Sequence, residues 1–149
     1  MDSEGQNRKI LSGQIIENID KISWSPKNLN LIYYSGANLE SRAYNFNIAN
    51  QKIASLHRAI KNIAFSPEGN KIAYLFSDSG SEEGNISVSF PDGSDFKNIF
   101  KTRLSRINID WPKENLLSFY NDGGSNEEVS LFLLEIENQK ITKILDEKK

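Results

Sequence analysis

The sequence contains no cysteine and a single histidine in 149 residues. Without cysteine the chain can form no disulfide framework, thiol nucleophile or cysteine zinc site, and redox chemistry does not indicate its compartment. His57 alone is a poor metal site, and the Gly-x-Ser-x-Gly turn of a serine nucleophile is absent. The sequence therefore predicts no catalytic, cofactor-binding or metal residues, and we expect a protein that is not an enzyme and needs no cofactor.

An excess of charge of one sign is also missing. Eighteen basic and twenty acidic residues give a formal net charge of −2, which has the wrong sign for a general binder of nucleic acid. Residues 1–20 are polar and charged and contain no apolar run. We therefore expect no nucleic-acid partner, no signal segment in this chain and no membrane insertion by it.

What the sequence does contain is a repeated unit around residues 65–74, which read FSPEGNKIAY. A strand ends there, a tight polar turn follows and a new apolar strand begins. Shorter copies read WSPKN at 24–28 and WPKEN at 111–115, so Pro26, Pro67 and Pro112 lie 41 and 45 residues apart. The chain therefore repeats one β unit three times.

Each unit contains four short segments with strand character and turn residues between them. The predicted strands are 22–25, 31–34, 43–48 and 52–56 in the first unit; 61–65, 71–76, 85–90 and 96–100 in the second; and 106–109, 116–120, 129–136 and 140–145 in the third. Four strands every 40 to 45 residues are typical of propeller blades. The expected fold is an all-β β-propeller with three four-stranded antiparallel blades.

The run 66–74, with Gly84-Asn85-Ile86 and the turn 90–94, resembles the TolB-type, WD-like β-propeller repeat. The resemblance covers residues 9–145 and is weaker in the first and third units, where residues 28–30 lack the turn glycine and Trp111-Pro112 lacks the serine. It implies a propeller used for binding, often in an extracytoplasmic compartment (periplasmic or cell-surface), and it supplies no fixed catalytic residues.

The blade count predicts how the chain is organised. We expect residues 1–8 to be a flexible terminus, 9–20 an orphan outer strand with its connector, and 21–59, 60–104 and 105–149 the three blades. Three blades leave two end faces uncovered, and closed propellers usually need at least four. The sequence therefore favours a homo-oligomer, for example two chains that form a six-bladed ring, or else a fragment of a longer propeller.

Propeller geometry places the loops between second and third strands on the same face as the connectors between blades. The connectors contain Arg58, Arg103 and Arg106, which we predict as a possible ligand face for an anion or acidic peptide. The alternative is a solvated face whose charges neutralise one another. Trp24, Phe65 and Trp111 recur at the repeat period and are predicted to pack between blades.

Two classes of function fit these features. The first is a non-catalytic interaction or scaffold module with a protein, peptide or glycan partner. The second is the gating or substrate-binding propeller segment of a larger hydrolase of the prolyl-oligopeptidase type.

The loop 122–128, DGGSNEE, carries oxygen ligands but lacks the spacing of a calcium loop, so we expect an ordinary hairpin loop there.

Overall fold

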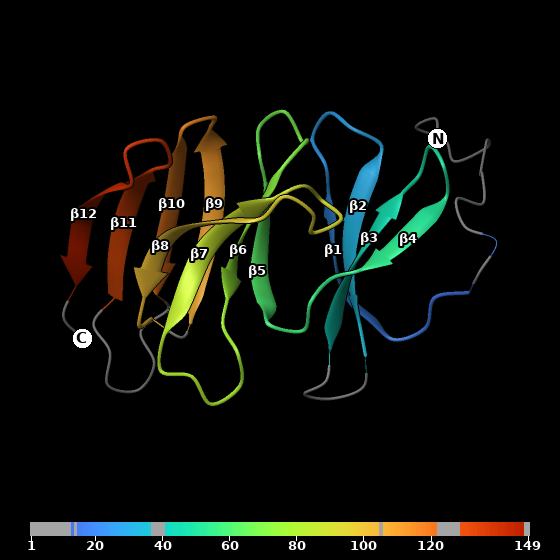
Figure 1. The fold of residues 1–149 in the computed structure, drawn as a ribbon, viewed down its shortest axis with the longest axis horizontal. Coiled ribbons are helices and arrows are strands. Elements are labelled where there is room, and N and C mark those ends of the chain that lie inside the picture. Colours follow the sequence, from blue (N-terminus) through green and yellow to red (C-terminus); the bar gives the residue numbers. More distant parts are fainter. Residues whose placement is uncertain (1–12, 14, 37–40, 105, 122–128, 148–149) are drawn as a thin grey trace.

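The computed structural model describes residues 13, 15–36, 41–104, 106–121 and 129–147. This part of the chain forms twelve strands in three four-stranded antiparallel sheets that follow one another along a row (Figure 1). The predicted fold class is confirmed, while the orphan strand expected near residues 9–11 lies outside the described residues. No helix that could cross a membrane occurs in the described ranges.

Within each sheet the strands are ordered as in the sequence. The first sheet consists of β1 (Ile19–Trp24), β2 (Asn30–Ser35), β3 (Arg42–Asn47) and β4 (Lys52–Ser55). The second sheet consists of β5 (Ile60–Phe65), β6 (Ile72–Phe76), β7 (Gly84–Ser89) and β8 (Lys97–Thr102). The third sheet consists of β9 (Ile107–Lys113), β10 (Leu116–Asn121), β11 (Val129–Glu135) and β12 (Lys140–Glu147).

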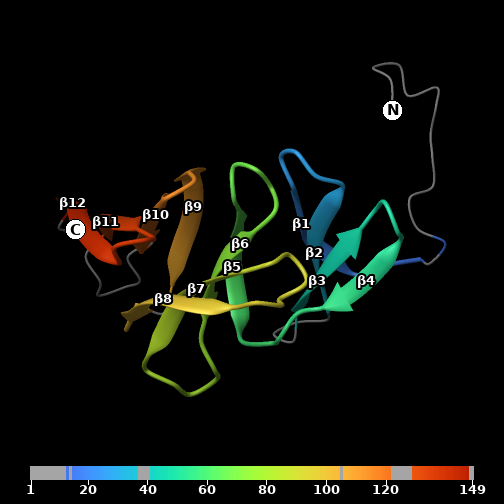
Figure 2. The same cartoon turned by 45° about the horizontal axis from the view of Figure 1, so that its top comes forward.

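The second sheet lies in the middle of the row, between the other two (Figure 2). Its strand β6 reads Ile-Ala-Tyr-Leu-Phe and is apolar at every position, because both of its faces are covered. Ile72 and Tyr74 pack toward the first sheet, and Ala73 and Leu75 pack toward the third. The alternating side chains of one strand therefore belong to two cores.

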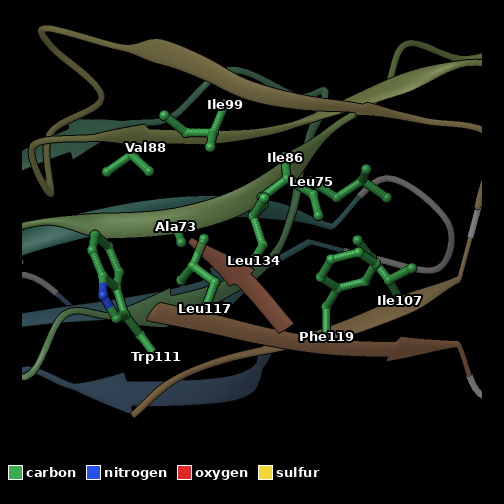
Figure 3. Packing of buried hydrophobic residues seen from close by; sticks show 10 residues of the cluster. All are labelled: Ala73, Leu75, Ile86, Val88, Ile99, Ile107, Trp111, Leu117, Phe119 and Leu134. Atoms are coloured by element: carbon green, nitrogen blue, oxygen red, sulfur yellow. The ribbon is translucent and has the colours of Figure 1, made fainter. Parts of the chain in front are cut away.

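The larger core lies between the second and third sheets (Figure 3). Its buried members are Ala73, Leu75, Ile86, Val88, Ile99, Ile107, Trp111, Leu117, Phe119 and Leu134. The core between the first and second sheets is built from Ile32, Ala43, Leu56, Ile60, Ile63, Ile72 and Tyr74. These two layers hold the three sheets together by burying apolar surface, which contributes about 25 cal/mol per Å² removed from water.

The three aromatic residues at the repeat period do not share one environment. Trp111 is 6% exposed and belongs to the larger core, and Phe65 packs half-buried against the smaller one. Trp24 is 56% exposed, so it does not pack between two sheets of the same chain. Trp24 pairs with Leu31 across β1 and β2, which places it on the face turned away from the second sheet.

Strand β9 is longer than the sequence predicted. We expected it to end at Ile109, but it continues through Pro112 and pairs Lys113 with Leu116. Proline removes one backbone donor and is therefore confined to edge strands and bulges. The position is tolerated because β9 pairs only with β10 and the register shifts between Leu116 and Ser118.

The turn between β5 and β6 joins the second sheet to the first. The Ser25 hydroxyl donates a hydrogen bond to the Gly69 carbonyl (3.1 Å), and the Asn28 side-chain Nδ2 donates one to the Glu68 carbonyl (2.8 Å). Lys27 also forms an ion pair with Glu68. Gly69 adopts a positive φ of 71°, and a Cβ there would overlap the Ser25 hydroxyl. The repeated turn is therefore a contact between sheets.

We predict that Gly69→Ala destabilises the protein more than Gly80→Ala does. Both glycines have positive φ, which costs an alanine about 1 kcal/mol, but a Cβ at Gly80 meets nothing within 4 Å. The additional clash at Gly69 should bring its loss to about 2 kcal/mol or more. Urea unfolding of both variants measures the difference, and equal losses would show that the turn is not fixed against the first sheet.

Candidate functional site: a basic cleft between the first two sheets

A cleft of about 820 Å³ opens between the first and second sheets. Four segments line it: the end of β2, the start of β3, the connector from β4 into β5, and the residues that follow β6. Loops from second strands and a blade connector therefore meet here, as propeller geometry predicts. The volume lies within the range of small-molecule sites, roughly 300–1,000 Å³.

A β-bulge in β5 shapes one wall of the cleft. The pairing between β5 and β6 shifts between Lys61 and Ala64, and Asn62 adopts a positive φ of 53°. Asparagine tolerates this conformation better than most residues. The Ile63 amide donates a hydrogen bond to the Tyr34 hydroxyl (3.4 Å), which links the bulge to β2 across the two sheets. Bulges change the direction in which neighbouring side chains project.

Three cationic side chains line the cleft, namely Arg42, Arg58 and Lys61. Among the described residues none of the three takes part in an ion pair, although Asp78 also lines the cleft. Glu40, in the loop before β3, lies outside the described residues. Within the described lining, positive charge therefore exceeds negative charge by two.

The three arginines predicted as a ligand face fall in different surroundings. Arg58 lines the cleft, whereas Arg103 pairs with Glu83 through its Nε (3.3 Å) and does not line it. Arg106 is exposed just before β9 and is also absent from the cleft lining. The structure thus brings Arg58 together with Arg42 and Lys61 and leaves the other two arginines outside this site.

At the junction between the second and third sheets, one carboxylate pairs with two cations. Glu83 forms ion pairs with both Lys101 and Arg103. The hydrogen bond and charge of Lys101, with a smaller contribution from Arg103, hold the pKa of the Glu83 carboxyl below its ordinary value. Arg103 at this junction is therefore paired within the chain, whereas Arg106 forms no described ion pair.

Two other polar residues accept hydrogen bonds from nearby backbone amides. The His57 Nδ1 accepts a hydrogen bond from the Ala59 amide (3.1 Å), and its ring lies 5.2 Å from that of Phe76. Asp92 accepts hydrogen bonds from the Ser94 amide (3.0 Å) and hydroxyl (2.6 Å), which lower the pKa of its carboxyl. Both residues therefore stabilise connections between strands.

The predicted hairpin loop at 122–128 falls outside the described residues. Elsewhere in the chain, the described His, Asp and Glu side chains form no group of three or more that could hold a metal ion. The cleft is therefore the candidate site that the described residues support, and its chemistry is recognition by cationic and hydroxyl groups.

No protein-family model matches the sequence, and no curated protein matches it. Solved structures do match. The β-propeller domain of the Trilobed protease from Pyrococcus furiosus superposes with a TM-score of 0.66 at 14% identity, over 89% of this chain and 43% of that one. TolB from Acinetobacter baumannii gives a TM-score of 0.60 at 17% identity, over 84% and 31%.

The acylaminoacyl peptidase from Pyrococcus horikoshii gives a TM-score of 0.65 at 13% identity, over 89% of this chain and 25% of that one. At such identities the likeness establishes the fold alone. The chain has a β-propeller fold, consistent with a propeller of the TolB type. It spans less than half the length of each of these three structures.

We predict that Lys101→Gln raises the pKa of the Glu83 carboxyl toward its ordinary value, and that Arg103→Gln raises it less. Because the folded-state pKa is lowered, the ion pairs contribute at neutral pH and are lost as pH falls through that pKa. Carboxyl ¹³C NMR titration of Glu83 measures both shifts. A larger shift in Arg103→Gln would mean that the lysine is not the main partner.

Proposed function

We propose that the chain is a non-catalytic interaction or scaffold module, a part of a β-propeller that completes its ring by pairing with a second copy. Its partner would be a protein, peptide or glycan that docks on the loop face. The observation that carries self-association is the exposed apolar surface of β1. Strand β1 presents Ile22, 47% exposed, and Trp24, 56% exposed, on the free side of the first sheet.

The repeat explains why this exposure matters. Ile63 and Phe65 in β5 and Ile109 and Trp111 in β9 stand at the same two positions of their units. Those four residues belong to the two intersheet cores, where they are buried or half-buried. The first sheet therefore retains the surface of a sheet that packs on a preceding neighbour. The proposed neighbour is the third sheet of a second copy.

The free side of the third sheet offers a complementary surface. Tyr120 and Leu131 pair across β10 and β11 on the side opposite the larger core, and Leu133 lies on the same side. Tyr120 is 45% exposed and Leu145 in β12 is 52% exposed. A two-fold arrangement would bring each third sheet against the first sheet of the partner, bury both surfaces and form a six-bladed ring.

The proposal assigns no catalytic residue, cofactor or nucleic-acid partner. The described cleft lining includes cations and hydroxyl groups, which suit recognition of a ligand. The likeness to TolB supports an extracytoplasmic location, periplasmic or at the cell surface. We propose this location together with the binding role.

A second candidate is a propeller segment of a larger hydrolase. Its support is the likeness to the propeller domain of the Trilobed protease and to an acylaminoacyl peptidase four times the matched length. A reading frame that continues into a Gly-x-Ser-x-Gly nucleophile turn would favour this candidate. Further blades without such a turn would favour the binding module.

We predict that the chain is a dimer at micromolar concentration and that Trp24→Glu weakens the dimer by about 30-fold or more, because a buried tryptophan anchor typically contributes about 2 kcal/mol or more. Phe96→Glu is the matched control, since Phe96 is 66% exposed on the turn before β8 and away from the proposed interface. Size-exclusion chromatography with light scattering measures both. A monomeric parent chain, or equal effects of the two variants, would overturn self-association.

A further inference from the structure

We infer that the cleft between the first two sheets binds an oxyanion, a carboxylate or phosphate group carried by the ligand. The inference rests on the proposed function in that the chain is a binding module. It does not depend on ring closure, because every segment that lines the cleft belongs to one chain and to two sheets already packed together.

The first argument is the convergence of three cations from separate elements. Arg42 begins β3, Arg58 lies in the connector after β4, and Lys61 lies in β5 beside the bulge. Like charges gathered in one cleft repel one another unless an anion is present. Guanidinium groups offer paired donors that match the two oxygens of a carboxylate or phosphate, and lysine adds a point charge.

The second argument is the contrast between the two junctions. At the junction of the second and third sheets, the Glu83 carboxylate forms ion pairs with both Lys101 and Arg103. At the junction of the first and second sheets, no described acidic group forms an ion pair with the cleft cations. The cations of the first junction therefore have no described carboxylate partner, whereas Lys101 and Arg103 at the second junction share Glu83; Arg106, next to them in the connector, forms no described ion pair.

The third argument is a hydroxyl donor in the cleft wall. The Tyr34 hydroxyl accepts a hydrogen bond from the Ile63 amide, and its own proton is engaged in no hydrogen bond among the described residues. Burial raises the pKa of the Tyr34 phenol, so the group remains a donor at neutral pH. It can therefore donate to an oxyanion that the arginines hold.

The test is an NMR titration of ¹⁵N-labelled chain with citrate and, separately, with inorganic phosphate at low ionic strength. We expect saturable shifts of the amide signals of residues 58–62 and 77–79, which line the cleft. Arg58→Gln and Arg42→Gln should each weaken binding by about tenfold or more, as expected for loss of a charge-assisted hydrogen bond. Arg103→Gln, outside the cleft, should leave the affinity unchanged.

Two further variants sharpen the test. Tyr34→Phe should weaken binding by about threefold to tenfold, since a neutral donor contributes less than a charged one. Asp78→Asn removes the acidic charge of the described cleft lining and should tighten binding. The ratio of the citrate and phosphate affinities distinguishes a carboxylate site from a phosphate site.

The inference is overturned if neither probe shifts the cleft amides, if the shifts lie elsewhere, or if Arg103→Gln weakens binding as much as Arg58→Gln. Folding of each variant is checked by its thermal unfolding midpoint, and Arg58→Lys preserves the charge if the glutamine variant is unstable. Failure of this test with an intact dimer would leave the proposed self-association standing. A monomer that binds citrate in the cleft would overturn self-association and leave the anion site standing.

Discussion

The protein depends on covering both faces of each four-stranded sheet. The sheets bury most of their apolar core against one another, and three sheets in a row provide two such layers, while Leu31, Tyr33 and Phe46 form a smaller buried cluster on the outer face of the first sheet. The second sheet has both faces covered and carries the strand β6, apolar at every position. The two outer sheets each have one face without a neighbouring sheet in the described part of the chain. Stability is therefore concentrated at the centre.

The same constraint separates the parts that hold the protein together from the part that can bind a ligand. Apolar side chains occupy the layers between sheets, because a charge buried there would lose its hydration. The cations Arg42, Arg58 and Lys61 lie instead where strand ends and connectors open into the cleft. The cleft proposed for binding and the sheet faces proposed for ring closure are thus different surfaces of the chain.

Much of the fold was predictable because it follows from local patterns. Turn residues recur along the chain at a regular period, and alternating apolar residues between them indicate strands. The three sheets and most strand positions could therefore be predicted. The prediction that β9 ends at Ile109 was wrong, because β9 continues through Pro112. An edge strand and a register shift tolerate this proline, which would end an inner strand. The left-handed conformations of Asn18 and Asn62, two of the five described non-glycine residues with positive φ, were also not predicted.

By itself, the sequence determined the repeat, the all-β class and the count of three sheets, because these depend on spacing and local backbone preference. Only the tertiary structure decided which equivalent positions are covered, so that Trp111 is buried and Trp24 is exposed. It also decided that Arg58 lies with Arg42 and Lys61 while Arg103 pairs with Glu83. Burial and charge pairing depend on which sheet lies opposite, and no local pattern contains that information.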